Sequence, residues 1–338
     1  MKIIVDIAHP AHVNFFKNAL YTLADEGHEV IVTALRRGKL PRIVESELSR
    51  FPIHYVGRHR GTRFSIIVEA NLLKIVRLFW LILRIRPDFG LSVGSFTMGA
   101  VLKLFGIPNV QFDDDPERTM NVLLERLTST RLFFPPIVEP HRNVGTMRAL
   151  KEWAYLSPQY FSSDVSVLDD YGLKPGWYIF VREVSTGSLN YLDQAENTVA
   201  SFAHQLSKQY PILLSLEDKQ AASMYPEEWI HLQEPIADIH SLLYYSRLVI
   251  SSGDSMAREG ALLGVPSFYV GVRNMKANDL LKNRGVLFQA PATEAAQQIN
   301  QALNQDWDST TRDLSRSSLA EEWDDITEFI IYQVNQRR

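Results

Sequence analysis

The sequence predicts an α/β protein organised into two domains of similar size. Its 338 residues are more than a single hydrophobic core usually serves. In both halves of the chain, short apolar runs typical of buried strands alternate with segments of helical periodicity. This is the pattern of parallel sheets covered by helices. We therefore expect Rossmann-like domains over residues 1–160 and 161–318, followed by a C-terminal helix over residues 319–338.

Composition excludes several classes of function. The chain has no cysteine, so disulfides, thiolate metal sites and cysteine nucleophiles are excluded. A net charge of −4 gives no reason to expect a nucleic-acid partner. The sequence opens directly on an apolar strand, without a signal-peptide pattern. The longest apolar stretch carries charged residues that disfavour a membrane span. We expect a cytoplasmic protein.

The first half opens as strand, helix and strand, the usual start of a nucleotide-type α/β domain. Its first turn lacks the glycine-rich dinucleotide fingerprint, so an NAD or FAD site is not expected. Residues 135–171 lose periodicity and contain recurring prolines, which indicates a linker between the domains. The expected strands cover residues 2–7, 28–33, 51–56, 89–93, 109–112 and 132–134, and the helices run to about residue 25, over 65–86 and 98–105, and onward from 116.

The helix expected over residues 65–86 is long and mostly apolar. Lys74, Arg77 and Arg84 fall within one sector of it. The simpler interpretation is a packed helix whose basic side chains snorkel to solvent. The alternative is an interfacial surface that touches anionic lipid at the inner face of the membrane.

The second half repeats the alternation of strands and helices without repeating the sequence of the first half. Its expected strands cover residues 176–181, 211–215, 230–232, 248–250, 267–270 and 286–288, and its helices cover residues 191–209, 236–244, 256–263, 277–283, 294–304 and 318–334.

The stretch over residues 248–270 is the strongest candidate for a ligand site. A short strand leads into a turn of small residues and then a helix, which ends at Gly264 and Pro266. Such a turn lets a ligand approach the backbone, and the helix directs free N–H groups and its positive dipole end toward it. A phosphate could be held there, with Glu259 accepting hydrogen bonds from a ribose. The alternative is an ordinary corner whose small residues only permit close packing.

A second candidate follows the strand over residues 109–112. Asp113, Asp114, Asp115 and Glu117 place four carboxylates within five residues. The carboxyl ends of strands are where open α/β sheets bind ligands. Capping of the next helix accounts for one or two of these residues, but not for four.

Three segments resemble one superfamily. DIAHPAHVNFFKNAL at residues 6–20 resembles the start of the prokaryotic family catalogued as domain of unknown function 354, within the GT-B superfamily of nucleotide-sugar glycosyltransferases and UDP-N-acetylglucosamine 2-epimerases. RPDFGLSVGSFTMGAVLKLFGIPNVQFDDD at residues 86–115 is similar to part of the peptidoglycan N-acetylglucosaminyltransferase. SGDSMAREGALLGVP at residues 252–266 matches the superfamily's serine–glycine–glycine, glutamate and leucine–glycine–x–proline. The resemblance implies two domains facing each other across a cleft, with the C-terminal helix returning to the first.

The resemblance also implies site residues. It places a diphosphate-binding turn at the start of the helix after residue 251, a glutamate on the ribose, an arginine on the phosphates, and polar groups facing the donor sugar. In the first domain it places two histidines toward the cleft. The donor-side residues are Ser252, Gly253, Asp254, Ser255, Glu259, Arg182, Arg273 and Asn278, and the histidines are His9 and His12.

The chain departs from the superfamily pattern in two places. Asp254 and Ser255 replace a glycine and a small residue, and a carboxylate beside a diphosphate is unfavourable unless a metal or an arginine intervenes. The glycine–aspartate–threonine and proline–glutamate–glutamate motifs of the epimerases are absent. Val93-Gly94-Ser95 and Asp115-Pro116-Glu117 stand at the corresponding positions, which weighs against epimerisation.

The activity implied is transfer of a sugar from a nucleotide-sugar donor, UDP-linked, in cell-envelope or surface-polysaccharide assembly. The helix dipole and Arg182 or Arg258 would stabilise the departing nucleoside diphosphate without a metal or other cofactor; Arg258 is ranked lower as a plausible surface residue. The base candidates are His9, His12, Asp113 and Asp114. The acceptor would be a glycan or lipid-linked. The alternatives are an epimerase or hydrolase of the same fold, and a non-catalytic relative.

Overall fold

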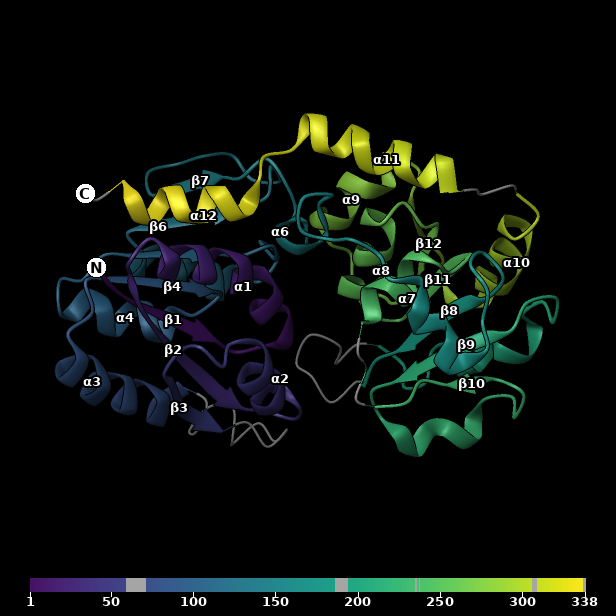
Figure 1. Cartoon of the computed structure of the whole chain (residues 1–338), viewed down its shortest axis with the longest axis horizontal. Coiled ribbons are helices and arrows are strands. Elements are labelled where there is room, and N and C mark those ends of the chain that lie inside the picture. The colour runs from purple at the N-terminus through teal and green to yellow at the C-terminus, as the bar shows by residue number, and fades with distance from the viewer. Residues whose placement is uncertain (59–70, 186–193, 235, 237, 306–308, 337–338) are drawn as a thin grey trace. The chain divides into compact units, whose positions relative to one another are not determined.

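The computed structural model describes residues 1–58, 71–185, 194–234, 236, 238–305 and 309–336. The chain divides into two compact units (Figure 1). Unit 1 consists of Met1–Tyr155 and Trp323–Arg338, and unit 2 consists of Leu156–Glu322. The return of the C-terminal segment to the first unit agrees with the expected fold. Each unit is an α/β layer structure with its own core.

The described strands of unit 1 form one parallel sheet of seven strands. Their order is β3-β2-β1-β4-β5-β6-β7, so the order reverses between β1 and β4. Ligands bind beside such reversals in open α/β sheets. The strands are β1 (Lys2–Ile7), β2 (Glu29–Arg36), β3 (Ile53–Arg58), β4 (Phe89–Val93), β5 (Asn109–Phe112), β6 (Arg131–Phe134) and β7 (Val144–Thr146).

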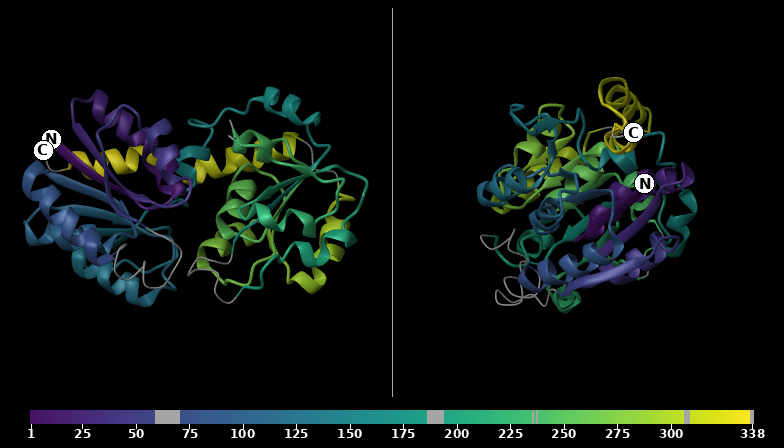
Figure 2. Two further views of the ribbon diagram at one scale, coloured as in Figure 1. Left: turned by 90° about the horizontal axis from the view of Figure 1, so that it is seen from below. Right: turned by 90° about the vertical axis from the view of Figure 1, so that its left-hand side faces the viewer.

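Helices cover both faces of this sheet (Figures 1 and 2). One face carries α1 (Pro10–Asp25), α2 (Leu40–Glu47) and α12 (Ile326–Asn335), with α1 in contact with both of the others. The other face carries α3 (Leu73–Ile85), α4 (Phe96–Leu104) and α5 (Thr119–Thr128), with α4 between α3 and α5. The sheet is therefore buried on both sides, which explains why its strands are continuous apolar runs.

The described strands of unit 2 form a parallel sheet of six strands. Their order is β10-β9-β8-β11-β12-β13, with the reversal between β8 and β11. The strands are β8 (Ile179–Glu183), β9 (Ile212–Leu216), β10 (Ile230–His231), β11 (Leu248–Ser251), β12 (Ser267–Tyr269) and β13 (Leu287–Gln289), and the α-helices are α7 (Ile239–Tyr244), α8 (Asp254–Leu262), α9 (Lys276–Lys282), α10 (Ala292–Ala302) and α11 (Ser309–Glu322). The short helix α6 (Trp153–Leu156) lies at the boundary of the units.

Two helix predictions for unit 2 and the C-terminus are wrong. Of the helix expected over residues 191–209, residues 191–193 lie outside the described residues, and the described remainder contains only a 3₁₀ helix, Ala200–Gln205. Asn197 adopts a left-handed φ of 53°, which an α-helix cannot continue through. The helix expected over residues 318–334 is two helices, because the chain leaves α11 before Asp325 caps α12.

Two predictions for unit 1 are also wrong. The segment expected to be a linker, residues 135–171, contributes β7 to the sheet of unit 1. That strand has only three residues, and its Gly145 packs against the ring of Phe133, so it carries no periodic signal. The helix expected from residue 116 begins at Thr119, because the carboxylates before it form a turn.

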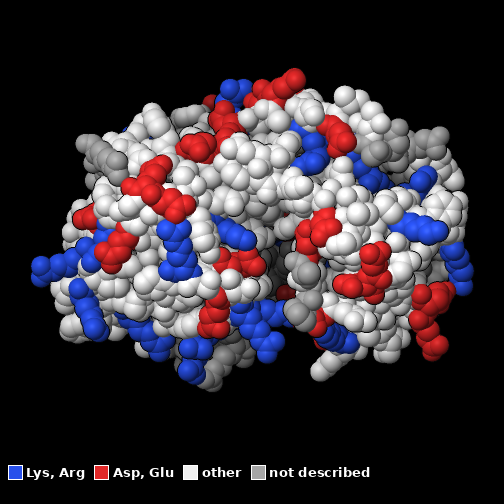
Figure 3. Space-filling view, in the orientation of Figure 1, with Lys and Arg blue, Asp and Glu red and all other residues white. Residues whose placement is uncertain are grey.

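Of the helix expected over residues 65–86, residues 65–70 lie outside the described residues, and α3 ends where Arg86 turns left-handed. Among the described residues, no helix is long and apolar enough to cross a membrane. Charged side chains of both signs are interspersed over the face shown in Figure 3.

Candidate functional site

The candidate residues of unit 1 lie at the carboxyl edge of its sheet, beside the reversal between β1 and β4. Loops after β1, β4 and β5 bring together His9, His12, Gly94 and the turn that begins at Asp113. The carboxyl ends of parallel strands meet at one edge, so residues far apart in sequence converge there.

His9 and His12 both use Nδ1 to accept hydrogen bonds from the backbone. His9 is the N-cap of α1 and accepts from Ala11 N at 3.2 Å, while His12 accepts from Ala8 N at 3.4 Å. His9, and not His12, is therefore the residue that caps α1. A neutral imidazole whose Nδ1 accepts carries its proton on Nε2. Burial, reinforced electrostatically by His9 and Lys151, holds the pKa of His12 well below its usual range. His12 is thus neutral near pH 7 and presents an N–H donor.

Asp113 organises the turn after β5. Its Oδ1 accepts from the backbone N–H of Asp114 at 2.7 Å and of Asp115 at 3.1 Å. Arg118 Nη2 lies 3.1 Å from Asp113 Oδ2, and Arg118 Nε lies 3.1 Å from Asp115 Oδ2. Burial raises the pKa of Asp113, and the guanidinium of Arg118 opposes that rise. Asp113 therefore has a structural task that the sequence did not reveal.

Glu125 of α5 joins this turn and is a residue that sequence reasoning missed. It is fully buried. A Cβ built on Gly94 would lie 3.6 Å from Arg118 Nη2, 3.7 Å from Glu125 Oε1 and 3.9 Å from Asp113 Oδ2, so all three side chains converge on that glycine. Burial, reinforced by the negative charge of Asp113, raises the pKa of Glu125 to about 10. Glu125 is therefore a neutral carboxylic acid near pH 7. The only sequence signal is an acid on the sheet-facing side of an otherwise amphipathic helix.

Lys151 is the second residue of this edge that the sequence did not reveal. Its Nζ lies 2.7 Å from Asp114 Oδ2, and its charge also acts on His12. It comes from the segment that was expected to be a linker. The structure thus brings His12, Asp114 and Lys151 into one electrostatic cluster.

Lys74 contradicts the expectation that it snorkels to solvent. It is buried, and its Nζ lies 2.5 Å from Asp6 Oδ2. Ser95 Oγ donates to the same oxygen at 2.6 Å, and Thr33 Oγ1 donates to Asp6 Oδ1 at 2.8 Å. This ion pair ties the start of α3 to the ends of β1 and β4. It is one of the supports on which the carboxyl edge is built.

In unit 2 the small-residue turn lies between β11 and α8. Gly253 is the N-cap of α8, and Ser251 Oγ accepts from Gly253 N at 3.1 Å. Ser252 Oγ accepts from Val184 N at 2.9 Å, so this hydroxyl holds the loop that follows β8. Ser252 therefore shapes the turn, whereas Ser255 lies one residue inside the helix and is partly exposed.

Asp254 is paired with an arginine. Its Oδ1 accepts from Ser255 N at 2.9 Å, and its Oδ2 lies 2.9 Å from Arg273 Nη1. Arg273 N donates to Tyr269 Oη at 3.2 Å, and burial raises the pKa of Tyr269 to about 12, so this phenol stays neutral. The arginine supplies the compensation that a carboxylate beside a diphosphate requires.

Arg258 is buried rather than a surface residue, which corrects the sequence interpretation. It is 1% exposed, and its Nη1 donates to Asn278 Oδ1 at 3.2 Å. Asn278 is also buried. These two side chains join α8 to α9, so Arg258 braces the helix whose N-terminus forms the turn.

Glu259 and Arg182 complete the cluster of unit 2. Glu259 Oε2 lies 3.7 Å from His240 Nε2, and His240 is a neighbour that the sequence did not single out. Arg182 lies beside Ser251 in the strand register. Its Nη1 donates to Ser215 Oγ at 2.9 Å, and its Nη2 lies 3.8 Å from Glu217 Oε2. These contacts hold the guanidinium at the carboxyl edge of the sheet.

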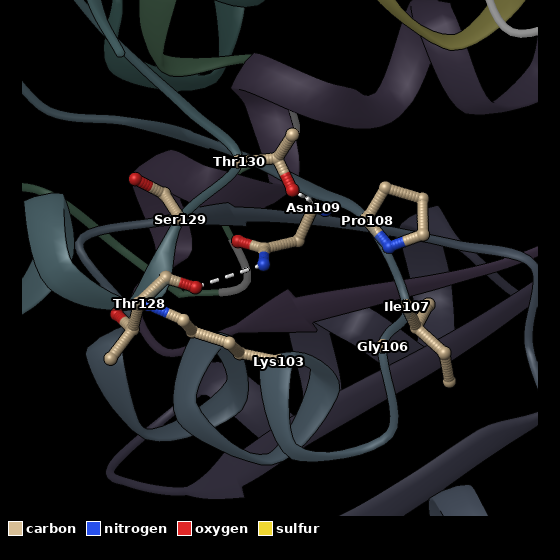
Figure 4. A pocket seen from close by; sticks show the side chains of 8 residues that line it. All are labelled: Lys103, Gly106, Ile107, Pro108, Asn109, Thr128, Ser129 and Thr130. Atoms are coloured by element: carbon tan, nitrogen blue, oxygen red, sulfur yellow. Dashed lines mark hydrogen bonds between the residues drawn. The ribbon is translucent and has the colours of Figure 1, made fainter. Parts of the chain in front are cut away.

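Over the described ranges, the structure shows no group of three or more histidine, aspartate or glutamate side chains that could hold a metal ion. A hollow of about 270 Å³ lies at the opposite, amino edge of the unit 1 sheet (Figure 4). There Asn109 Nδ2 donates to the carbonyl of Thr128 at 3.0 Å. Two helix C-termini line this hollow, and their negative dipole ends do not suit an anion.

Comparison with known proteins agrees with this architecture. A family model described as "Protein of unknown function (DUF354)" matches residues 1–337. The uncharacterized protein MJ0665 of Methanocaldococcus jannaschii is 22% identical over 276 residues, which cover 78% of this chain and 80% of that protein.

Two solved structures are similar over nearly their whole length. A putative UDP-N-acetylglucosamine 2-epimerase from Listeria monocytogenes has a TM-score of 0.68 and 12% identity, covering 98% of this chain and 94% of that one. The glycosyltransferase SsfS6 of Streptomyces sp. SF2575, solved with thymidine diphosphate, has a TM-score of 0.65 and 17% identity, covering 99% of both chains. These likenesses show a GT-B fold.

Proposed function

The chain belongs to the DUF354 family, and on that premise we propose that it is a glycosyltransferase that uses a nucleotide-sugar donor. The observation that carries the proposal is the turn before α8. Small residues there leave the N-terminus of α8 accessible to a ligand. Arg273 neutralises Asp254, and Arg182 lies on the neighbouring strand. Dipole and guanidinium charge together stabilise a nucleoside diphosphate, both bound and departing.

Each donor-side residue has a proposed task. Arg182 and Arg273 contact the diphosphate, with the N–H groups of α8 near Ser255 beside them. Glu259 accepts hydrogen bonds from the ribose hydroxyls, and His240 orients its carboxylate. Asn278 faces the donor sugar. The expected nucleobase of the donor is uracil, because the chain resembles enzymes that use UDP-sugars.

The acceptor side is proposed to be the carboxyl edge of unit 1. We assign the base to Asp114. Its Oδ2 pairs with Lys151, but Asp113 accepts two backbone hydrogen bonds in addition to its pairing with Arg118, and the Nδ1 atoms of His9 and His12 accept backbone hydrogen bonds. His12 donates through Nε2 to the substrate. Asp113 and His9 position the loops that carry these groups.

In the transfer step, the acceptor hydroxyl oxygen forms a bond to the anomeric carbon while the bond from that carbon to the β-phosphate oxygen breaks. The hydroxyl proton goes to Asp114, and the nucleoside diphosphate leaves with the electron pair. The acceptor is proposed to be a glycan or a lipid-linked sugar of the cell envelope, met at the inner face of the membrane.

A 2-epimerase or hydrolase is the second candidate, because a putative epimerase is among the similar structures. The missing epimerase motifs weigh against it, since Val93-Gly94-Ser95 stands where one is expected. The two are distinguished by incubating the protein with UDP-sugar and no acceptor. Turnover under that condition supports the epimerase or hydrolase and contradicts the transferase.

The first test is a thermal-shift titration with UDP, TDP, GDP and CMP, with and without magnesium. Binding to the native state raises its melting temperature by mass action. We expect a saturable rise of several degrees with UDP that Glu259→Ala abolishes. Glu228→Ala, at an exposed position elsewhere in unit 2, is the matched control. A folded wild-type protein that responds to no nucleotide would favour the non-catalytic alternative.

A further inference from the structure

Exposed apolar side chains gather on the face of unit 1 formed by α3, α4 and α5. Trp80 is 63% exposed and Leu104 is 71% exposed. Single exposed apolar residues are ordinary, but a contiguous set of them marks an interaction site. We call this set the apolar face; its main members are Val76, Trp80, Leu83, Leu104, Leu123 and Leu127.

Contacts between neighbouring helices make the apolar face continuous across α3, α4 and α5. The ring centroid of Phe79 lies 5.6 Å from that of Trp80 and 5.2 Å from that of Phe105, which joins α3 to the end of α4. Lys103 Nζ donates to the carbonyl of Leu127 at 2.6 Å, which joins α4 to α5. α4 contacts both α3 and α5, and α3 and α4 lie side by side in Figure 1.

The exposed charges within the three helices are positive, and the exposed acids Asp88 and Glu117 lie just beyond the ends of α3 and α5. Arg77, Arg84, Arg86 and Lys103 are exposed, while the single acid within the three helices, Glu125, is buried. This contrasts with the net charge of −4 of the whole chain. Blue atoms accordingly lie over α3 at the lower left of Figure 3. Cations beside an apolar, tryptophan-bearing surface are what an anionic bilayer surface binds.

We propose that the apolar face binds to the surface of an anionic bilayer. Trp80 and the leucines enter the boundary between headgroups and acyl chains, and the arginines pair with lipid phosphates. A second copy of this chain is the less favoured occupant. A two-fold interface would place the same cations against one another, and like charges in apposition are unfavourable.

The position of the face also suits a surface-bound protein. α3 and α5 both begin at the carboxyl edge of the sheet, where Lys74 pairs with Asp6 and Arg118 pairs with Asp113. The face therefore extends from the edge proposed to receive the acceptor. The binding itself does not depend on the proposed activity, and it is measured without any nucleotide sugar.

The test is co-sedimentation of the full chain with vesicles of phosphatidylcholine alone or with 30% phosphatidylglycerol added, at 0.1 M and 0.5 M NaCl. We expect binding only to the anionic vesicles, weakened by salt. Each arginine near such a surface contributes about 1 kcal/mol, so Arg77→Gln with Arg84→Gln should weaken binding about 30-fold. Leu104→Ser with Leu123→Ser should weaken it about tenfold.

Matched controls lie in unit 2. Leu314→Ser removes a leucine that is 66% exposed, and Lys208→Gln removes an exposed cation; neither should change binding. Brominated lipids should quench wild-type tryptophan fluorescence but quench Trp80→Phe much less.

Three results would overturn the proposal. They are equal binding to neutral vesicles, a loss of binding with the control variants as large as with the face variants, and self-association in sedimentation velocity that Leu104→Ser abolishes. The last result would identify a second copy as the occupant.

Discussion

The two carboxyl edges occupy the same place in two similar sheets, yet they balance charge differently. In unit 2 each acid has a cationic or ionisable partner: Asp254 lies against Arg273, and Glu259 lies against His240. In unit 1 the buried acids near Gly94 outnumber Arg118, so burial forces Glu125 to keep a proton. We infer that the carboxyl edge of unit 2 receives the negative charge of a ligand. We infer that the carboxyl edge of unit 1 accepts and donates protons.

The largest expected effect concerns the ion pairs that support each edge. Lys74→Met should lower the free energy of unfolding by about 3–5 kcal/mol, because it leaves the buried carboxylate of Asp6 without its cation. Arg273→Met should cost only about 1–2 kcal/mol, because that pair is partly exposed and Ser255 N still donates to Asp254. Urea unfolding followed by circular dichroism measures both. The double variant Asp6→Asn with Lys74→Met is the control and should recover much of the lost free energy of unfolding. If Lys74→Met and Arg273→Met lower the free energy of unfolding equally, the proposed difference between the two edges is wrong.

The next effect is catalytic and separates the tasks of the two edges. Asp114→Asn should lower kcat of sugar transfer by about 10²–10⁴-fold, because it removes the proton acceptor. His12→Gln keeps an N–H donor and should retain more activity than His12→Ala. Steady-state kinetics with a UDP-sugar and a glycan acceptor checks both. If His12→Gln and His12→Ala are equally inactive, His12 rather than Asp114 is the base.

The pH dependence of stability sharpens the comparison further. The folded-state pKa of Glu125 is raised to about 10, above its unfolded value near 4.5, so the folded state holds the proton longer. The contribution of Glu125 to stability is fully present below about pH 4.5 and is lost as the pH rises toward 10. One retained proton corresponds to about 1.4 kcal/mol of unfolding free energy per pH unit.

Glu125→Gln, which cannot ionise, should therefore flatten the fall in stability between pH 5 and 9. Urea midpoints measured across this range report the slope, and Glu139→Gln controls for the loss of an exposed carboxylate of the same unit. An unchanged slope in Glu125→Gln would mean that Glu125 is ionised in the folded protein.

The smallest effect concerns the helix caps. His9→Ala should lower the free energy of unfolding by about 1 kcal/mol, because α1 loses the acceptor for Ala11 N. His9→Asn offers another acceptor and should restore most of it. α8 has Gly253 at its N-cap, without a capping side chain. Loss of activity in His9→Asn despite restored stability would show that His9 does more than cap.

Sequence patterns predicted the parallel sheets and the turn before α8 because these features are local. A strand, small residues and a helix stop follow one another within about twenty residues, and their order alone indicates a turn at a helix N-terminus. The same pattern made Glu259 a candidate for the ribose, and the family resemblance added Arg182.

Other features depend on contacts between distant segments. Lys151 reaches Asp114 from a segment without periodicity, and Lys74 pairs with Asp6 across 68 residues. Glu125 is buried only because α5 packs on the sheet beside Gly94. The missed strand β7 and the wrongly predicted helix over residues 191–209 have a similar origin. The three-residue pairing of β7 with β6 and the left-handed backbone of Asn197 both override local propensity.

The central claim is that unit 2 binds the nucleotide while unit 1 performs the chemistry. The most direct test is calorimetric titration of UDP into the wild type, Glu259→Gln, Arg182→Gln and Asp114→Asn. We predict that the first two variants weaken binding at least about tenfold, as loss of one charge-assisted hydrogen bond implies, and that Asp114→Asn binds UDP like the wild type. Wild-type protein that binds no UDP, or an equal loss of affinity in Asp114→Asn, would contradict the claim.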